Sequence, residues 1–275
     1  MSATSSDGKK KLILQASDMS IVFGGLRAVS DFNAELYQGE LVGLIGPNGA
    51  GKTTVFNMLS GVYTPTEGQI TFWDKKGRVH IVNKRTPAQL NKIGISRTFQ
   101  NIRLFGSLTV ADNVRIALHS GRGVRPLDVL FRTPRFRKDE AFMSLRVHHL
   151  LKLFGIDRKS EELARNLPYG EQRKLEIARA LAANPSLLLL DEPAAGMNPQ
   201  ETHELMELIA FIRKEFGVTI LLIEHDMKLV MGICERLIVL DYGRIIAQGK
   251  PEEIRTNPQV IKAYLGSEAA EIMED

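Results

Sequence analysis

The sequence predicts an α/β protein with a parallel-sheet core, an antiparallel β subdomain and an inserted α-helical subdomain. Three observations predict this arrangement. Short unbroken apolar runs alternate with segments of helical periodicity, as in parallel strands that helices cover on both faces. The first third of the chain instead holds short strand-like runs joined by turns. A long segment from about residue 105 to residue 165 has a helical pattern that interrupts the alternation.

Length and composition are those of an ordinary globular protein. The 275 residues allow one large domain or two closely packed subdomains, and 44% of them are hydrophobic and 25% charged. A net charge of +4 is too small to indicate a nucleic-acid partner. No run of about 18 apolar residues could span a bilayer, and the first residues lack the apolar stretch of a signal peptide. We therefore expect a soluble, cytoplasmic protein.

The antiparallel part is predicted from four short strand-like runs. Turn residues separate some of them, such as Asp74–Gly77 (DKKG), and turns of this kind join neighbouring strands of a hairpin. The four runs are Lys11–Val22, Ala28–Leu36, Gln69–Trp73 and Arg78–Val82.

The parallel core is predicted from apolar runs with polar ends. Helical spacing of apolar residues marks the segments between them, with Leu205, Leu208 and Ile212 on one face of Glu201–Phe216. A second helix is predicted over Glu171–Ala183, and Pro185 ends it. The predicted core strands are Glu40–Ile45, Ser186–Leu190, Val218–Ile223 and Arg236–Leu240, the last of which turns back into Ile245–Gln248.

A phosphate-binding loop follows the first of these core strands and opens a helix. Its residues fit the pattern G-x-x-x-x-G-K-[ST] in the strand–loop–helix context that the pattern requires. Glycines let successive backbone N–H groups point at phosphate oxygens, and the helix N-terminus adds partial positive charge. We expect Lys52 to bridge the β- and γ-phosphates and the Thr53 hydroxyl to reach Mg²⁺. The loop consists of Gly46, Pro47, Asn48, Gly49, Ala50, Gly51, Lys52, Thr53 and Thr54.

Acidic residues end a second core strand, and a histidine ends a third. Asp191 and Glu192 follow the apolar run before Pro193, as in a Walker B element. We expect Asp191 to hold Mg²⁺ and Glu192 to polarise the water that attacks the γ-phosphate. Taken alone, the pair could be an ordinary acidic strand end. His225 follows Val218–Ile223 and should reach the same edge of the sheet, where ligands of open α/β folds bind.

The segment Leu167–Arg173 (LPYGEQR) carries a family resemblance. It opens a helix and resembles the LSGGQ signature that separates ABC ATPases from other P-loop proteins. The resemblance implies a P-loop NTPase (RecA-like) fold and ATP hydrolysis coupled to transmembrane transport. It also implies that Tyr169, Gly170 and Glu171 close over ATP held by a second ATPase subunit, so that a head-to-tail dimer encloses two ATP molecules.

Other elements of the family occur in the expected order. The resemblance places Phe23 at the aromatic that stacks on adenine, and Gln100 in the loop that senses Mg²⁺ and the γ-phosphate. It makes His225 the switch histidine and residues 194–198 the D-loop. It covers roughly residues 11–266 as one ATPase domain, with a core over 11–103 and 166–266 and a helical subdomain over about 104–165. Residues 1–10 and 267–275 are expected to be flexible termini.

Four positions in three elements depart from the family pattern. Pro168 and Tyr169 replace the signature serine and the glycine after it, which removes the serine hydroxyl expected at the γ-phosphate. Asn198 replaces the usual D-loop aspartate, so a polar contact across the dimer would carry a different charge. Phe23 replaces tyrosine, which keeps the stacking surface and loses the hydroxyl.

Longer stretches, such as SRTFQNIRLFGSLTV, resemble the ATPases of branched-chain amino acid importers (the LivG type). The resemblance implies two membrane permease subunits, a sister or copied ATPase subunit and an extracytoplasmic substrate-binding protein reached through the permeases. It places the chain peripherally on the cytoplasmic face of the cell membrane. Importers of urea or short amides, and the lipopolysaccharide exporter, have similar ATPases and stay open as alternatives.

Two further classes fit less well. A soluble ABC ATPase of DNA repair or translation would carry two cassettes or a long coiled-coil insert, and this chain has neither. The signature helix and His225 argue against a P-loop kinase or a switch GTPase. A GTPase would also need [NT]-K-x-D, and the nearest match, Asn83–Thr86, lacks the aspartate.

Two local features complete the sequence-based predictions. Cys234 is the single cysteine, which excludes an internal disulfide, and its apolar neighbours predict a buried, inert thiol. Basic residues gather in the helical segment, where they form either a solvated face or a patch near anionic headgroups or a membrane partner. They are Arg122, Arg125, Arg132, Arg135, Arg137 and Lys138.

Overall fold

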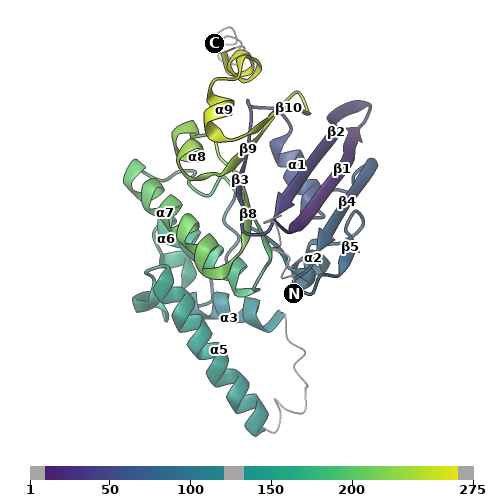
Figure 1. Cartoon of the computed structure of the whole chain (residues 1–275). Coiled ribbons are helices and arrows are strands. Elements are labelled where there is room, and N and C mark those ends of the chain that lie inside the picture. Colours follow the sequence, from purple (N-terminus) through teal and green to yellow (C-terminus); the bar gives the residue numbers. More distant parts are fainter. Residues whose placement is uncertain (1–9, 121–132, 266–275) are drawn as a thin grey trace, which may run out of the picture.

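The computed structural model describes residues 10–120 and 133–265, which form two β-sheets with helices around them (Figure 1). The larger sheet has the strand order β10-β9-β3-β8-β7-β6. Its strands are parallel except for β10, which runs antiparallel to β9. The strands are β3 (Leu41–Ile45), β6 (Ile95–Arg97), β7 (Leu187–Asp191), β8 (Thr219–Ile223), β9 (Arg236–Asp241) and β10 (Arg244–Gly249).

The smaller sheet is antiparallel and has the order β2-β1-β4-β5. The turn Asp74–Gly77 joins its last two strands, with the Gly77 N–H donating to the Asp74 carbonyl at 2.8 Å. This agrees with the turn predicted from the sequence. The strands are β1 (Leu12–Phe23), β2 (Leu26–Tyr37), β4 (Glu67–Trp73) and β5 (Val79–Ile81).

Helices cover the parallel sheet on both faces. A group of helices at one end of the molecule, α3 and α5, comes from the segment predicted to be helical (Figure 1). The helices are α1 (Lys52–Leu59), α2 (Pro87–Ile93), α3 (Val110–Ser120), α5 (Pro134–Leu153), α6 (Tyr169–Ala182), α7 (Pro199–Phe216), α8 (Met227–Ile233) and α9 (Pro251–Arg255).

Two hydrophobic cores lie on the two faces of the parallel sheet. Alternate residues of each strand enter different cores, so that Leu188 and Leu190 belong to one and Leu187 and Leu189 to the other. The first core packs the sheet against α6, α7 and α8. The second packs it against α1 and the antiparallel sheet. Strands buried on both faces explain the unbroken apolar runs in the sequence.

The structure adds elements that the sequence did not predict. These include β6 and α2, which lie between the predicted strand Arg78–Val82 and the helical segment. Of the basic residues in that segment, Arg137 and Lys138 are exposed on α5. Arg122, Arg125, Arg132 and the side chain of Arg135 lie outside the described residues, as do the terminal segments 1–9 and 266–275.

This topology brings three loops together. β8 lies directly between β3 and β7 in the sheet, and all three run parallel. The segments after their carboxyl ends are therefore neighbours: the phosphate loop after β3, Glu192 after β7 and His225 after β8. The carboxyl edge of an open parallel sheet is where ligands of α/β folds bind.

Candidate active site

The phosphate loop curls tightly between β3 and α1. Gly46 has φ 151° and Gly51 has φ 98°, conformations that side chains rarely adopt. A Cβ on Gly46 would lie 2.1 Å from the Leu240 carbonyl oxygen, so only glycine fits there. No side chain caps the N-terminus of α1. The first N–H groups of that helix are therefore available to an anion.

Lys52 lies folded into this loop. Its Nζ donates hydrogen bonds to the carbonyl oxygens of Gly46 at 2.7 Å and Pro47 at 2.8 Å. Burial lowers the pKa of Lys52, and the nearby Glu192 carboxylate opposes that shift. The carboxylate and the ammonium thus interact across the loop, which places a cation and a candidate base at one site.

Glu192 is held on both carboxylate oxygens. His225 Nε2 lies 2.5 Å from Oε1, and Gln100 Nε2 donates to Oε2 at 3.0 Å. The Glu192 side chain is 12% exposed and that of His225 50% exposed, so the group opens to solvent on the histidine side. The structure brings Glu192, His225 and Gln100 into contact from three separate loops. A carboxylate fixed in this way can orient a water molecule for attack.

Asp191 is paired with a residue that the sequence analysis did not single out. Arg97 Nη2 lies 2.7 Å from Asp191 Oδ2, and both side chains are almost fully buried. Arg97 also donates to Asn57 Oδ1 and Ser60 Oγ at 2.7 Å, and its guanidinium lies over the rings of Phe56 and Phe99. Arg97 lies three residues before Gln100 in the sequence, but no periodic pattern or motif indicated that it would contact Asp191.

The signature segment begins helix α6. Pro168 is the N-cap residue, and no side chain caps the helix. Tyr169 is 45% exposed, and its ring packs beside Gly196, where an added Cβ would lie 3.4 Å from the ring. Glu171 is paired with Lys159, whose Nζ lies 2.6 Å from Glu171 Oε2. The pairing offsets the negative charge of Glu171 at this helix end.

Comparison with known proteins identifies the family. The ABC transporter family model matches residues 29–195, and a branched-chain amino acid ATP-binding cassette transporter model matches residues 244–270. The chain is 48% identical over 254 residues to the high-affinity branched-chain amino acid transport ATP-binding protein LivG of Escherichia coli (strain K12), covering 92% of this chain and 98% of that protein. The chain belongs to the ATP-binding subunits of ABC transporters. It is thus an ATPase, with the fold and reaction that the signature implied.

Solved structures agree with this ABC ATPase in fold. The ADP conformation of MJ1267, an ATP-binding cassette of an ABC transporter, has a TM-score of 0.77 and 29% identity, covering 93% of this chain and 99% of that one. The dimeric post-hydrolysis state of MJ0796, an ATP-binding cassette bound to ADP and Pi, has a TM-score of 0.70 and 25% identity, covering 87% and 99%.

In the segment predicted to be the D-loop, Asn198 makes local hydrogen bonds. Asn198 is the N-cap of α7: its Oδ1 accepts from the Glu201 N–H at 2.9 Å, and the Glu201 carboxylate accepts from the Asn198 N–H at 3.1 Å. Glu224 holds the start of the loop by accepting from the Ala194 N–H at 2.9 Å. Burial raises the pKa of Glu224, and that hydrogen bond opposes the shift. The side chain predicted to reach across a dimer is therefore engaged in a helix cap.

The predicted adenine-stacking residue has an aromatic neighbour. Phe23 ends β1 and is 42% exposed, and its ring packs edge-on against Tyr63, with centroids 5.2 Å apart. The C-terminal segment also approaches the phosphate loop. Burial raises the pKa of Tyr264 to about 12, and a hydrogen bond with the Gly46 backbone opposes that shift. Neither Tyr63 nor Tyr264 was predicted, because their partners are far away in the sequence.

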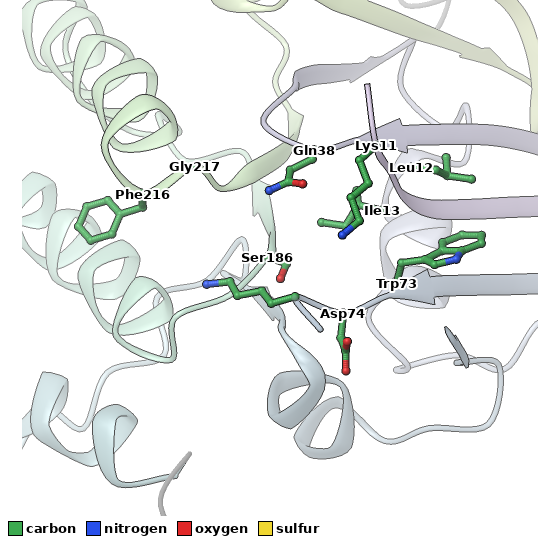
Figure 2. A pocket seen from close by; sticks show the side chains of 10 residues that line it. Lys11, Leu12, Ile13, Gln38, Trp73, Asp74, Ser186, Phe216 and Gly217 are labelled. Atoms are coloured by element: carbon green, nitrogen blue, oxygen red, sulfur yellow. The ribbon is translucent and has the colours of Figure 1, made fainter. Parts of the chain in front are cut away.

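A separate cavity lies at the amino ends of the parallel strands, opposite the end that carries the phosphate loop. It has a volume of about 190 Å³ and is lined by Gln38, Ser186 and Gly217, just before β3, β7 and β8, and by Trp73 and Asp74 (Figure 2). The phosphate loop follows the opposite end of β3, so this cavity lies away from that loop. In residues 10–120 and 133–265, no helix is long and apolar enough to cross a membrane.

Proposed function

We propose that this ABC ATPase powers an importer of branched-chain amino acids. Its similarity to LivG over almost the whole of both chains, and the second family match at residues 244–270, support this cargo class over urea, short amides or lipopolysaccharide. The observation that carries the enzymatic part is the Glu192 carboxylate, held by His225 and Gln100 beside the phosphate loop.

In this proposal the phosphate loop and Lys52 hold the triphosphate of ATP. The ammonium turns from the loop carbonyls to the β- and γ-phosphates, which replace those carbonyls as acceptors. The backbone N–H groups of residues 46–54 and the N-terminus of α1 bind the phosphate oxygens, and Phe23 stacks on the adenine. Glu192 then polarises the attacking water as general base, while His225 and Gln100 keep its carboxylate oriented.

The residues around the loop also fit Mg²⁺. The candidate ligands are oxygen donors, as this cation prefers: the Thr53 hydroxyl, the Gln100 amide oxygen and the Asp191 carboxylate, one oxygen of which is paired with Arg97. Among the described residues there is no group of three His, Cys, Asp or Glu that could hold a metal. Mg²⁺ is commonly bound through one or two carboxylates together with phosphate and water. When bound, Mg²⁺ would neutralise charge that develops on the phosphates.

The second half of each ATP site is supplied by another subunit. We assign this role to Tyr169, Gly170 and Glu171 at the start of α6, which would close over ATP bound to a sister or copied ATPase. The dimeric state of MJ0796 supports such an arrangement. Residues 11–266 would act as one ATPase domain, with residues about 104–165 as a helical subdomain. Dimer closure would drive two permeases, fed by an extracytoplasmic binding protein, from the cytoplasmic face of the membrane.

Replacing Glu192 tests the enzymatic proposal. Glu192→Gln should bind ATP with unchanged affinity but release phosphate about 10²–10³-fold more slowly, because the amide cannot accept the proton of the attacking water. Fluorescent-nucleotide titration and single-turnover phosphate release measure the two quantities. Glu204→Gln, at an exposed position on α7, is the control. Turnover near the wild-type rate in Glu192→Gln would remove Glu192 from the role of base.

The cargo proposal has its own test. The transporter reconstituted in liposomes with its permeases and binding protein should hydrolyse ATP faster when leucine, isoleucine or valine is present on the binding-protein side. Urea and short amides should leave the rate unchanged. Stimulation by urea but not by leucine would reassign the cargo without affecting the ATPase assignment.

A further inference from the structure

Arg173 is an arginine on helix α6 with no solvent-exposed surface. It ends the signature segment Leu167–Arg173, one helical turn after Tyr169, and its guanidinium donates hydrogen bonds to five different residues at 2.6–3.1 Å. A buried charge costs several kcal/mol to desolvate unless it is fully paired. A hydrophobic side chain would fill the same space without this desolvation cost. The presence of arginine here therefore has to be explained by the groups to which it donates hydrogen bonds.

Three of these acceptors are consecutive backbone carbonyls. Nη2 donates to the carbonyl oxygens of Asp191 and Glu192 at 2.7 Å each, and Nε donates to that of Pro193 at 3.1 Å. Consecutive carbonyls converge in this way only if the chain turns sharply between them. Glu192 supplies that turn with φ 45°, a left-handed conformation that non-glycine residues seldom adopt. The cation therefore stabilises the strained residue that bears the candidate base.

The remaining contacts reach the second loop of the site. Nη1 donates to the Phe99 carbonyl at 2.6 Å, immediately before Gln100, and to Glu176 Oε2 at 2.7 Å. The other oxygen of Glu176 accepts from the Arg103 N–H at 3.3 Å, beyond Gln100. The pair Arg173–Glu176 thus holds the backbone on both sides of Gln100 through hydrogen bonds. Both residues lie on α6, whose first turn carries Tyr169 and Gly170.

We infer that Arg173 is a positioning residue for hydrolysis. It holds the backbone of Asp191–Pro193 in the turn that points the Glu192 carboxylate at the phosphate loop, and it ties that turn and the Gln100 segment to the signature helix. A shift of α6 then moves Glu192 and Gln100 with it. This inference rests on the proposed function, because it concerns the same base and the same helix.

The test compares two substitutions of Arg173 in two backgrounds. Arg173→Met keeps similar length and removes all donors, whereas Arg173→Lys keeps the positive charge but cannot reach all five acceptors together. Each is made in the wild-type chain and in Glu192→Gln. Lys174→Met, the next residue on the same helix with a partly exposed side chain, is the matched control. Nucleotide affinity, single-turnover phosphate release and thermal unfolding are measured on the full chain.

A positioning role predicts a specific pattern. Arg173→Met should keep ATP affinity within about threefold and lose about 10²-fold in turnover, the effect of misplacing a reacting group by an ångström. In Glu192→Gln the same change should lose less than about threefold, because residues that act as a unit are not additive. In the wild-type chain, Arg173→Lys should lose less turnover than Arg173→Met. In Glu192→Gln it should also lose less than about threefold.

Other patterns would overturn the inference. Equal losses in both backgrounds would mean that Arg173 acts independently of Glu192, and wild-type turnover in Arg173→Lys would mean that charge alone suffices. If Arg173→Met does not fold, Arg173→Lys carries the same comparison. Absence of ATP turnover in the wild-type chain would instead contradict the proposed function, so the two failures are separable.

Discussion

Asn198 illustrates how a departure from the family pattern acts at the scale of one residue. Its side chain and that of Glu201 form a reciprocal cap at the start of α7. We predict that Asn198→Ala lowers the free energy of unfolding by about 1 kcal/mol, because the Glu201 N–H loses its acceptor. Asn198→Asp should stay within about 0.5 kcal/mol, since aspartate caps helices equally well.

Urea unfolding of the two variants measures these differences, with Gln200→Ala on the exposed face of the same helix as control. If Asn198→Ala unfolded like the wild-type chain while turnover collapsed, the side chain would act across a dimer and the cap would be incidental.

The single cysteine of the chain should react slowly in the folded protein. Cys234 is buried, and burial raises the pKa of its thiol to about 12. At pH 8 only about one thiol in 10⁴ is then ionised, and the thiolate is the reactive form. Labelling of the native protein by a disulfide reagent should therefore be slow and should quicken as pH rises. Addition of urea beyond the unfolding midpoint should make it complete within minutes. Rapid labelling of the native chain would contradict the burial.

Among the elements, Arg97 links the phosphate-loop helix to two strands of the sheet. It lies on β6, pairs with Asp191 at the end of β7 and bonds Asn57 and Ser60 near the end of α1. We predict that Arg97→Met lowers the free energy of unfolding by about 3–5 kcal/mol, because a buried carboxylate is left unpaired. Arg97→Met combined with Asp191→Asn should recover part of that loss.

Chemical denaturation measures both variants. Arg27→Met is the control, since Arg27 pairs with Glu67 at 2.6 Å on the surface, where such pairs contribute less than about 1 kcal/mol. Equal effects at positions 97 and 27 would mean that the buried pair does not hold these elements together.

There are physical reasons why some elements were not predicted from the sequence. β6 has three residues, too few for a periodic pattern, and α2 buries only Leu90, so it presents no apolar stripe. The signal for α2 was the capping box of Thr86 and Gln89 around Pro87, which holds the helix at its end. Strands buried on both faces, such as β7 and β8, were predicted nearly to the residue because burial fixes every position.

The residues of the site also fall into two groups, those that the sequence predicted and those that it did not. Local patterns predicted the phosphate loop and placed Glu192 and His225 at one sheet edge, because strand ends and loops can be recognised from consecutive residues. Arg97 and Arg173 were missed, since each acts on residues tens of positions away. Their signal was a charged residue in an otherwise apolar context, as in the i, i+3 pair Arg173 and Glu176 on the buried side of α6.

In the whole molecule, the two faces of the parallel sheet carry different groups of predicted site residues. One core joins α1 and the antiparallel sheet, which bear the phosphate loop and Phe23. The other joins α6, α7 and α8 with the helical segment, which bear the signature residues. The phosphate loop and the start of α6 therefore belong to different halves of one subunit. In the dimer that we propose, a second subunit would present its α6 to this phosphate loop, and nucleotide would join the two.

Because of that arrangement, assembly of the chain should depend on nucleotide. Without nucleotide the purified chain should be a monomer, because no ligand yet attracts the N-termini of α1 and a partner's α6 to one phosphate. Glu192→Gln with ATP and Mg²⁺ should form a dimer, and chelation of Mg²⁺ should reverse it. Sedimentation velocity at several protein concentrations measures this, with Lys52→Ala as the control that should not dimerise, because it lacks the cation that holds the γ-phosphate. A stable dimer in the absence of nucleotide would contradict an interface built around ATP. A Glu192→Gln chain that stays monomeric alone but pairs with a sister ATPase when ATP is added would identify the partner as the sister, with the same nucleotide at the interface.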